Sequence, residues 1–294
     1  MTPLATLLTE RARALEGHLE GAVRGEVRAV HQSRVVSRRL REALPVAGRG
    51  GGKAGRRARK TFRKITRALG PVRELDVALA HLDEGLGAGT DADRIPQIAV
   101  ERVRAHLLAA RERRRERMLA KLDRLDLEDA VAQVTRVAGA SEGVTAFSAA
   151  RLEKRIRRRA AALSAAIDEA GGEYDPERLH NVRIATKKLR YALEVAAATG
   201  DVGAAADSEW LGHVQGRLGL MHDYQVLLEH VAHVREEAAR DTPGATGLKA
   251  MAAAYDRECR ALHAEYLELA TRLASLARGR SAGEHETGET TTDG

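Results

Sequence analysis

The sequence predicts an all-α protein, and two observations lead to that prediction. Helix-forming Ala, Leu, Arg and Glu recur in nearly every segment, and the apolar residues among them lie three or four positions apart. Alternating runs of β-branched residues between turns, which are typical of strands, are missing. We therefore expect helices along most of the chain and no sheet.

Glycine and proline residues break the helical pattern at several places in chain order. The breaks fall at Pro45 with residues 48–52, at 85–93, at 139–147, at 171–172 and at 242–244. The stretch 139–147 is the expected central linker. About eight helices result, and they are predicted over residues 4–20, 24–44, 54–84, 94–125, 147–170, 176–199, 204–239 and 246–278.

The composition excludes several classes of protein. A chain of 294 residues can bury one large core or two moderate ones without disulfides, and its single cysteine, Cys259, fits a reducing compartment. No apolar stretch is long enough to cross a membrane and no secretory signal is visible, so we expect a cytoplasmic protein. Only 3% of residues are aromatic, which argues against base stacking on single-stranded nucleic acid.

Charge is distributed unevenly along the chain. The segment 281–294 has four acidic residues and no Lys or Arg, and its Gly/Thr/Glu-rich composition predicts a disordered tail. Without that tail, 49 basic residues stand against 38 acidic ones, a net charge of +11. We therefore expect the body of the protein to bind an anionic partner.

The chain contains an internal repeat. Residues 30–41 align with 179–190, and residues 69–74 align with 218–223, at the same offset of 149 positions. Two separated matches in one register predict a duplicated four-helix unit. The two units are expected to span residues 1–138 and 147–280.

The first pair of repeats places positive charge on one face of a helix. At about 100° per residue, one wedge about 80° wide holds His31, Arg34, Arg38 and Arg41. In the second copy, the corresponding face holds His180, Arg183, Lys187 and Arg190. We expect neither wedge to contain an acidic partner, although like charges at this spacing destabilise a helix. An anion that compensates the repulsion is the favoured interpretation, and an ordinary solvated surface is the alternative.

A third basic row lies on the expected helix 54–84. Its members fall within about 60° of one another, and they are Arg56, Lys60, Arg63 and Arg67. The second repeat lacks this row, so the positive field should be stronger in the first half.

These residue types suit phosphate groups. The planar guanidinium of arginine donates to two oxygens at once, and rows of cations suit an extended polyanion better than a compact anion. The paired His31 and His180 have two open interpretations: a charge that titrates near pKa 6.5, or a neutral hydrogen-bonding group between helices.

Several enzymatic interpretations fail on the sequence. Residues 48–52 lack the Gly-Lys-Ser/Thr of a phosphate-binding loop, and neither HExxH nor a Cys/His metal spacing occurs. His222-Asp223 has the form of a metal-binding pair, but its repeat partner is Arg73-Glu74, which favours a structural role. We therefore expect no catalytic residue, no metal and no cofactor.

At the repeated motifs the chain resembles the conserved histidine α-helical domain family, known as CHAD. The family pattern is similar to His-x-x-Arg-x-x-x-(Arg/Lys)-(Arg/Lys)-Leu-Arg, which matches residues 31–41 and 180–190, and the following Leu-Gly element matches at 69–74 and 218–223. Glu74 stands where an aspartate is usual. The resemblance implies one CHAD domain over residues 1–280, built from two four-helix bundles related by a pseudo-twofold axis, ahead of the tail at 281–294.

The resemblance also implies a function. Basic side chains would line a shared channel or surface that binds inorganic polyphosphate, and some family members localise to polyphosphate granules. A triphosphatase domain with a Glu-x-Glu-x-Lys signature often accompanies CHAD. This signature is missing here, and triphosphatase activity is therefore not carried over. We expect a non-enzymatic polyphosphate-binding protein, with polyphosphate-metabolising enzymes as further partners.

Two alternatives stay open. A basic helical surface also attracts nucleic acid, so a nucleoid-associated protein is the second hypothesis, with non-specific binding because no base-reading motif is present. The third is a phosphohydrolase that uses His31 or His180, although neither wedge supplies a carboxylate or a metal site.

Overall fold

The computed structural model describes residues 2–47, 52–85, 95–140, 145–237 and 243–283. Within these ranges the regular elements are nine α-helices and one short 3-10 helix, and no strand occurs. The predicted all-α class is confirmed. The elements are α1 Pro3–Arg24, α2 Val27–Ala43, η1 Leu44–Val46, α3 Gly52–Glu84, α4 Gln97–Leu122, α5 Leu127–Gly139, α6 Thr145–Ala170, α7 Pro176–Ala197, α8 Val202–Glu237 and α9 Pro243–Ala282.

One helix of the structure was not predicted from the sequence. The helix expected over 94–125 ends at Leu122, and the separate helix α5 follows it. Asp126 begins α5 because its carboxylate accepts a hydrogen bond from the backbone N–H of Asp129 at 2.8 Å. The first half of the chain therefore holds five helices rather than four, and the internal duplication stays a prediction.

The structure describes only part of two features that the sequence predicts, the central linker and the acidic tail. The central linker expected over 139–147 overlaps both α5, which ends at Gly139, and α6, which begins at Thr145, and its residues 141–144 lie outside the described ranges. Helix α9 runs on to Ala282, past the expected start of the acidic tail, and residues 284–294 also lie outside those ranges.

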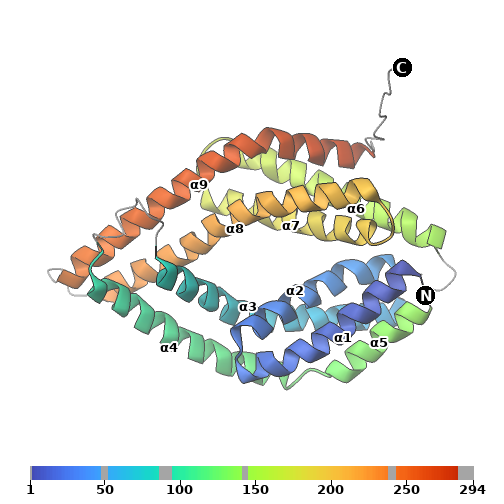
Figure 1. Ribbon diagram of the computed structural model, residues 1–294, viewed down its shortest axis with the longest axis horizontal. Helices are drawn as coiled ribbons and strands as arrows, with labels where there is room; N and C mark the ends of the chain where they lie inside the picture. The colour runs from blue at the N-terminus through green and yellow to red at the C-terminus, as the bar shows by residue number, and fades with distance from the viewer. Residues whose placement is uncertain (1, 48–51, 86–94, 141–144, 238–242, 284–294) are drawn as a thin grey trace, which may run out of the picture.

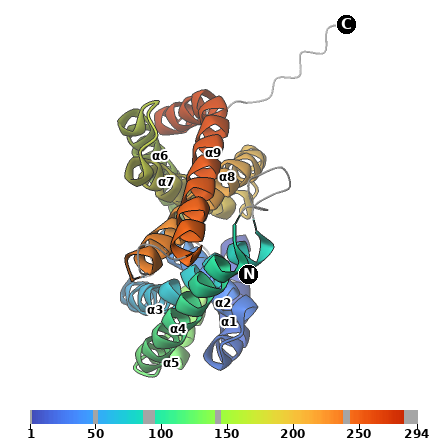
Figure 2. The ribbon, with the colours of Figure 1, turned by 90° about the vertical axis from the view of Figure 1, so that its left-hand side faces the viewer.

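The helices form two groups that lie one above the other in Figure 1. In the first, α1 contacts α2 and α5, and α3 contacts α2 and α5; in the second, α6, α7, α8 and α9 contact one another in sequence, and α6 also contacts α9. Helix α4 leaves the first group along α3 and reaches α8 and α9. Figure 2 shows the same separation from the side, with α9 crossing towards α4.

Apolar packing joins the two groups. One large core includes Leu40 and Phe62 of the first group and Leu189 of the second. A second core lies where α3, α4, α8 and α9 meet, and it includes Leu107 and Val231, both fully buried. Helices α2 and α7, which both contribute to the first core, contact each other across the two groups.

No described helix combines the length and the apolar character that a membrane span requires.

The second core should be required for stability. Leu107→Ala removes a fully buried side chain and should lower the free energy of unfolding by about 2–5 kcal/mol. Its neighbour Leu108 is 50% exposed, so Leu108→Ala should change that free energy by about 0.5 kcal/mol or less. Denaturant unfolding checks both. Equal losses in the two variants would contradict the assignment of Leu107 to a core.

Candidate anion-binding site

The apolar faces of α2 and α7 determine where their cationic faces point. Leu40 of α2 and Leu189 of α7 are fully buried, each on the side opposite the basic wedge. Ser37 fixes α2 further, because its hydroxyl lies 2.9 Å from the Thr66 hydroxyl on α3 in a buried contact. Since α2 and α7 contact each other, the two basic wedges are brought to the same region between the groups.

Four of the predicted cations meet at the centre of this region. Burial, followed by the nearby Arg38 and Arg183, lowers the pKa of Arg34 to about 10. Burial, followed by the nearby Arg183, Arg38 and Arg34, lowers the pKa of Lys187 to about 6. Arg34 and Arg38 come from α2, and Arg183 and Lys187 from α7. We call these four residues the central cluster.

Carboxylates reach only the edge of the central cluster. One Asp223 oxygen lies 3.9 Å from Nη2 of Arg183, and the other lies 3.8 Å from Nε2 of His81. Glu74 faces Arg34, and burial raises the pKa of its carboxyl above the ordinary value. Among the described residues, two carboxylates therefore accompany three guanidinium groups and Lys187, and the centre keeps a positive excess.

The motif histidines lie beside this cluster in similar surroundings. His180 and His222 face each other with 3.2 Å between their Nδ1 atoms, so at least one of the two rings is neutral. Burial and then Arg183 lower the pKa of His222 to about 4. Burial and then Arg73, which stands at the position equivalent to His222 in the repeat, lower the pKa of His31. These surroundings favour the neutral interpretation for both motif histidines.

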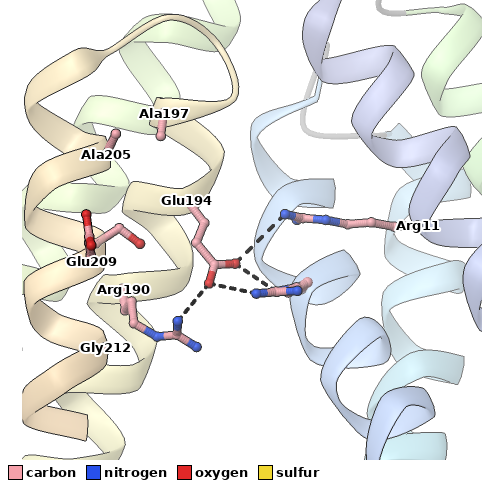
Figure 3. A pocket seen from close by; sticks show the side chains of 9 residues that line it. Arg11, Arg190, Glu194, Ala197, Ala205, Glu209 and Gly212 are labelled. Carbon is pink, nitrogen blue, oxygen red and sulfur yellow. Dashed lines mark hydrogen bonds and ion pairs between the residues drawn. The ribbon is translucent and has the colours of Figure 1, made fainter. Parts of the chain in front are cut away.

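Glu194 occupies the outer end of the α7 wedge. Its carboxylate lies 3.1 Å from Nη1 of Arg190, 2.8 Å from Nε of Arg39 and 3.9 Å from Nη2 of Arg11. Figure 3 shows Glu194 reaching from α7 towards Arg11 on α1, across a pocket that Glu209 also lines. This carboxylate therefore links the second group of helices to two helices of the first.

Glu42 makes the reciprocal link from α2. It accepts a hydrogen bond from Nε of Arg155 at 2.9 Å, and it pairs with Nη2 of Arg159 at 3.2 Å. Both arginines belong to α6 of the second group. Arg41, beside Glu42, has its pKa lowered by burial and by its neighbours Arg38 and Arg63.

The expectation of acid-free wedges is therefore wrong. Glu194 follows Arg190 by four positions and lies on the same face of α7, one turn beyond the end of the aligned motif. Arg190 is neutralised by Glu194, and its Nε donates to Gln215 at 3.0 Å. Glu42 and Arg11 also lie outside the aligned motif, so the repeat did not reveal them.

The row on α3 is only partly connected to the central region. Arg63 lies close enough to Arg41 to lower the pKa of that guanidinium. The other three members, Arg56, Lys60 and Arg67, are exposed, and no described carboxylate forms an ion pair with them. They extend the positive surface along α3 of the first group.

Glu194 should stabilise the contact between the two groups. Glu194→Gln leaves three guanidinium groups without their shared carboxylate, and we expect a loss of about 1.5–3 kcal/mol in the free energy of unfolding. Glu209→Gln, in the same pocket but exposed, is the matched control and should have little effect. Denaturant unfolding measures both variants. An equal effect of the two changes would show that Glu194 does not link the groups.

Comparisons with known proteins agree with this architecture. Two uncharacterized proteins of Mycobacterium tuberculosis, MT2285 and Rv2226, are each 31% identical to the chain over 226 residues. The match covers 73% of this chain and 41% of each relative, so the chain spans about two fifths of the length of the curated relatives it matches.

Two solved structures share the fold. The crystal structure of the CHAD domain from the plant Ricinus communis matches with a TM-score of 0.59 and 20% identity, over 97% of this chain and 91% of that one. PptA from Streptomyces chartreusis matches with a TM-score of 0.54 and 18% identity, over 96% and 97% of the two chains. The sequence model of the CHAD domain itself matches residues 6–232. The chain belongs to the CHAD domain family.

Proposed function

We propose that the chain binds inorganic polyphosphate, without catalysing a reaction, where α2 and α7 face each other. The observation that carries the proposal is the central cluster, in which cations from two helices lie close enough to lower one another's pKa values. Holding such charges together in a partly buried place is unfavourable without a compensating anion. An anion with several charges removes that cost and gains charge-assisted hydrogen bonds.

The arrangement of the cations favours an extended anion over a compact one. The central cluster continues through Arg41 to Arg63 and then to the exposed row on α3. An orthophosphate ion reaches only part of this series, whereas a chain of phosphates contacts many cations at once. Counterions released from polyphosphate would contribute much of the affinity. The family resemblance supports the same ligand class.

Cellular location follows as part of the proposal. A protein that binds polyphosphate in the cytoplasm would accumulate where the polymer accumulates, which includes polyphosphate granules. Enzymes that make or degrade the polymer would then meet this protein on a shared ligand.

The central cluster should be required for binding. A variant in which glutamine replaces all four residues, Arg34, Arg38, Arg183 and Lys187, should not bind long-chain polyphosphate at about 0.15 M salt. The reason is that the positive charge which attracts the polyanion is lost. The matched control replaces the same number of exposed arginines elsewhere, at Arg28, Arg117, Arg124 and Arg136. Because Lys187 is largely neutral at pH 7, this control removes at least as much positive charge as the cluster variant does, and it should retain most of the affinity.

Binding is measured by titration with labelled polyphosphate, and circular dichroism checks that both variants remain helical. Equal losses in the two variants would contradict a localised site. If duplex DNA competes at equal phosphate concentration, the site does not select polyphosphate and the nucleic-acid hypothesis replaces the proposal. Phosphate release during the titration would contradict the non-catalytic part.

Binding should also depend on pH through Lys187. Its pKa is about 6 in the free protein, mainly because of burial, so it is largely neutral at pH 7 and above. A bound polyanion favours the ammonium form, so binding takes up a proton and affinity falls as pH rises. We expect a loss of up to about tenfold per pH unit between about pH 7 and 9.

The variant Lys187→Arg tests this assignment, because a guanidinium keeps its charge across that range. Lys187→Arg should flatten the pH profile, whereas Lys249→Arg, at an exposed position on α9, should leave it unchanged. Identical slopes in all three proteins would show that another group takes up the proton.

A further inference from the structure

A cluster of histidines lies away from the basic wedges, where α4 of the first group contacts α8 of the second. His106, His233 and Glu237 each offer one ligand atom, and these atoms all lie within 4.8 Å of one another. Nε2 of His233 is 3.5 Å from the Glu237 carboxylate. Both nitrogen and oxygen donors thus converge on one point.

A fourth side chain supports the arrangement. Nδ1 of His230 lies 3.2 Å from Nε2 of His106, and the two rings have their centroids 5.3 Å apart. The ring of His106 also lies 5.0 Å from that of His233. His230, His233 and Glu237 occupy one face of α8 because they are three and four positions apart.

We propose that His106, His233 and Glu237 bind a divalent transition-metal ion of the zinc class, with His230 holding the ring of His106. Imidazole and carboxylate suit zinc and its neighbours, whereas calcium and magnesium prefer oxygen ligands. Two histidines and one glutamate are a known zinc ligand set that leaves a further coordination position open. The hydrogen bond between His106 and His230 resembles the second contact that fixes a metal-binding imidazole.

The geometry needs only a small adjustment. Ligand atoms around a tetrahedral zinc ion are separated by about 3.4 Å, which follows from metal–ligand distances of about 2.1 Å. The present separations, up to 4.8 Å, require the side chains to close slightly. His233 and Glu237 are exposed, so rotation of their side chains achieves this without displacing the core.

Burial and nearby charges have opposing effects on the affinity of this site for a metal ion. Metal binding requires neutral imidazoles, and burial lowers the pKa of His106 and His230, which favours the neutral form. Arg113 near His106 and Arg114 near His230 oppose a cation, while Glu237 offsets part of that repulsion. We therefore expect weaker binding than at a structural zinc site with thiolate ligands.

The site would connect the two groups of helices. Its ligands come from α4 and α8, beside the second core that includes Leu107 and Val231. A metal ion that binds the folded protein stabilises it by mass action, so it should raise the unfolding temperature. This inference does not depend on polyphosphate binding.

The sequence pattern did not reveal this site. His106 and His230 are 124 positions apart, and His233 and Glu237 do not form the HExxH pattern. Only the crossing of α4 and α8 brings them together.

Calorimetric titration of chelator-treated protein with Zn²⁺, in phosphate-free buffer, tests the proposal. We expect one ion per chain, binding lost in His106→Ala and in His233→Ala, and a clear loss in Glu237→Gln. His230→Ala should weaken binding by about 10- to 100-fold. The matched control is His213→Ala, an exposed histidine on the same helix, which should bind as the unchanged protein does.

A second measurement separates binding from folding. Zn²⁺ should raise the unfolding temperature of the unchanged protein and of His213→Ala but not of His106→Ala, and Co²⁺ should give a visible absorption band in the first two alone. Circular dichroism establishes that each variant is folded before titration. Absence of binding, or binding of equal affinity in His106→Ala and His213→Ala, would overturn the proposal.

Discussion

Mutual repulsion among the cations of α2 and α7 is the constraint on which the rest of the structure depends. Arg34 and Arg38 face Arg183 and Lys187 in a region partly removed from water, and the lowered pKa of Lys187 records how unfavourable that is. Such a cluster persists only when other interactions hold the two helices in place. The two apolar cores contribute to that force, because each includes residues of both groups.

Two carboxylates also help to hold the two groups of helices together against this repulsion. Glu194 neutralises Arg190 at the outer end of the α7 wedge and also pairs with Arg39 of the first group. Glu42 pairs with two arginines of α6, so each carboxylate connects its own motif helix to the opposite group. They leave the central cluster with a positive excess. These acidic residues therefore join the two groups of helices, while uncompensated positive charge remains where a polyanion would bind.

Much of the fold could be predicted from local patterns. Helix spacing and the glycine and proline breaks indicated the class and most elements, and α5 was missed because its start depends on one capping side chain, that of Asp126. The repeated motif also identified the residues of the central cluster. What the sequence could not supply was the partner of each charge: Glu194 meets Arg39 and His106 meets His230 only after the helices cross. Contacts between positions more than a hundred residues apart follow from packing, which local periodicity does not encode.

The central claim is that many cations act together on one extended anion. It is tested most directly by measuring the dissociation constant across polyphosphate lengths and salt concentrations with the unchanged protein. Affinity should rise steeply with chain length, and orthophosphate should bind weakly. The logarithm of the affinity should fall linearly with the logarithm of the salt concentration, with a slope of several units. Affinity per molecule that is equal for orthophosphate and long polyphosphate, or that is insensitive to salt, would contradict it.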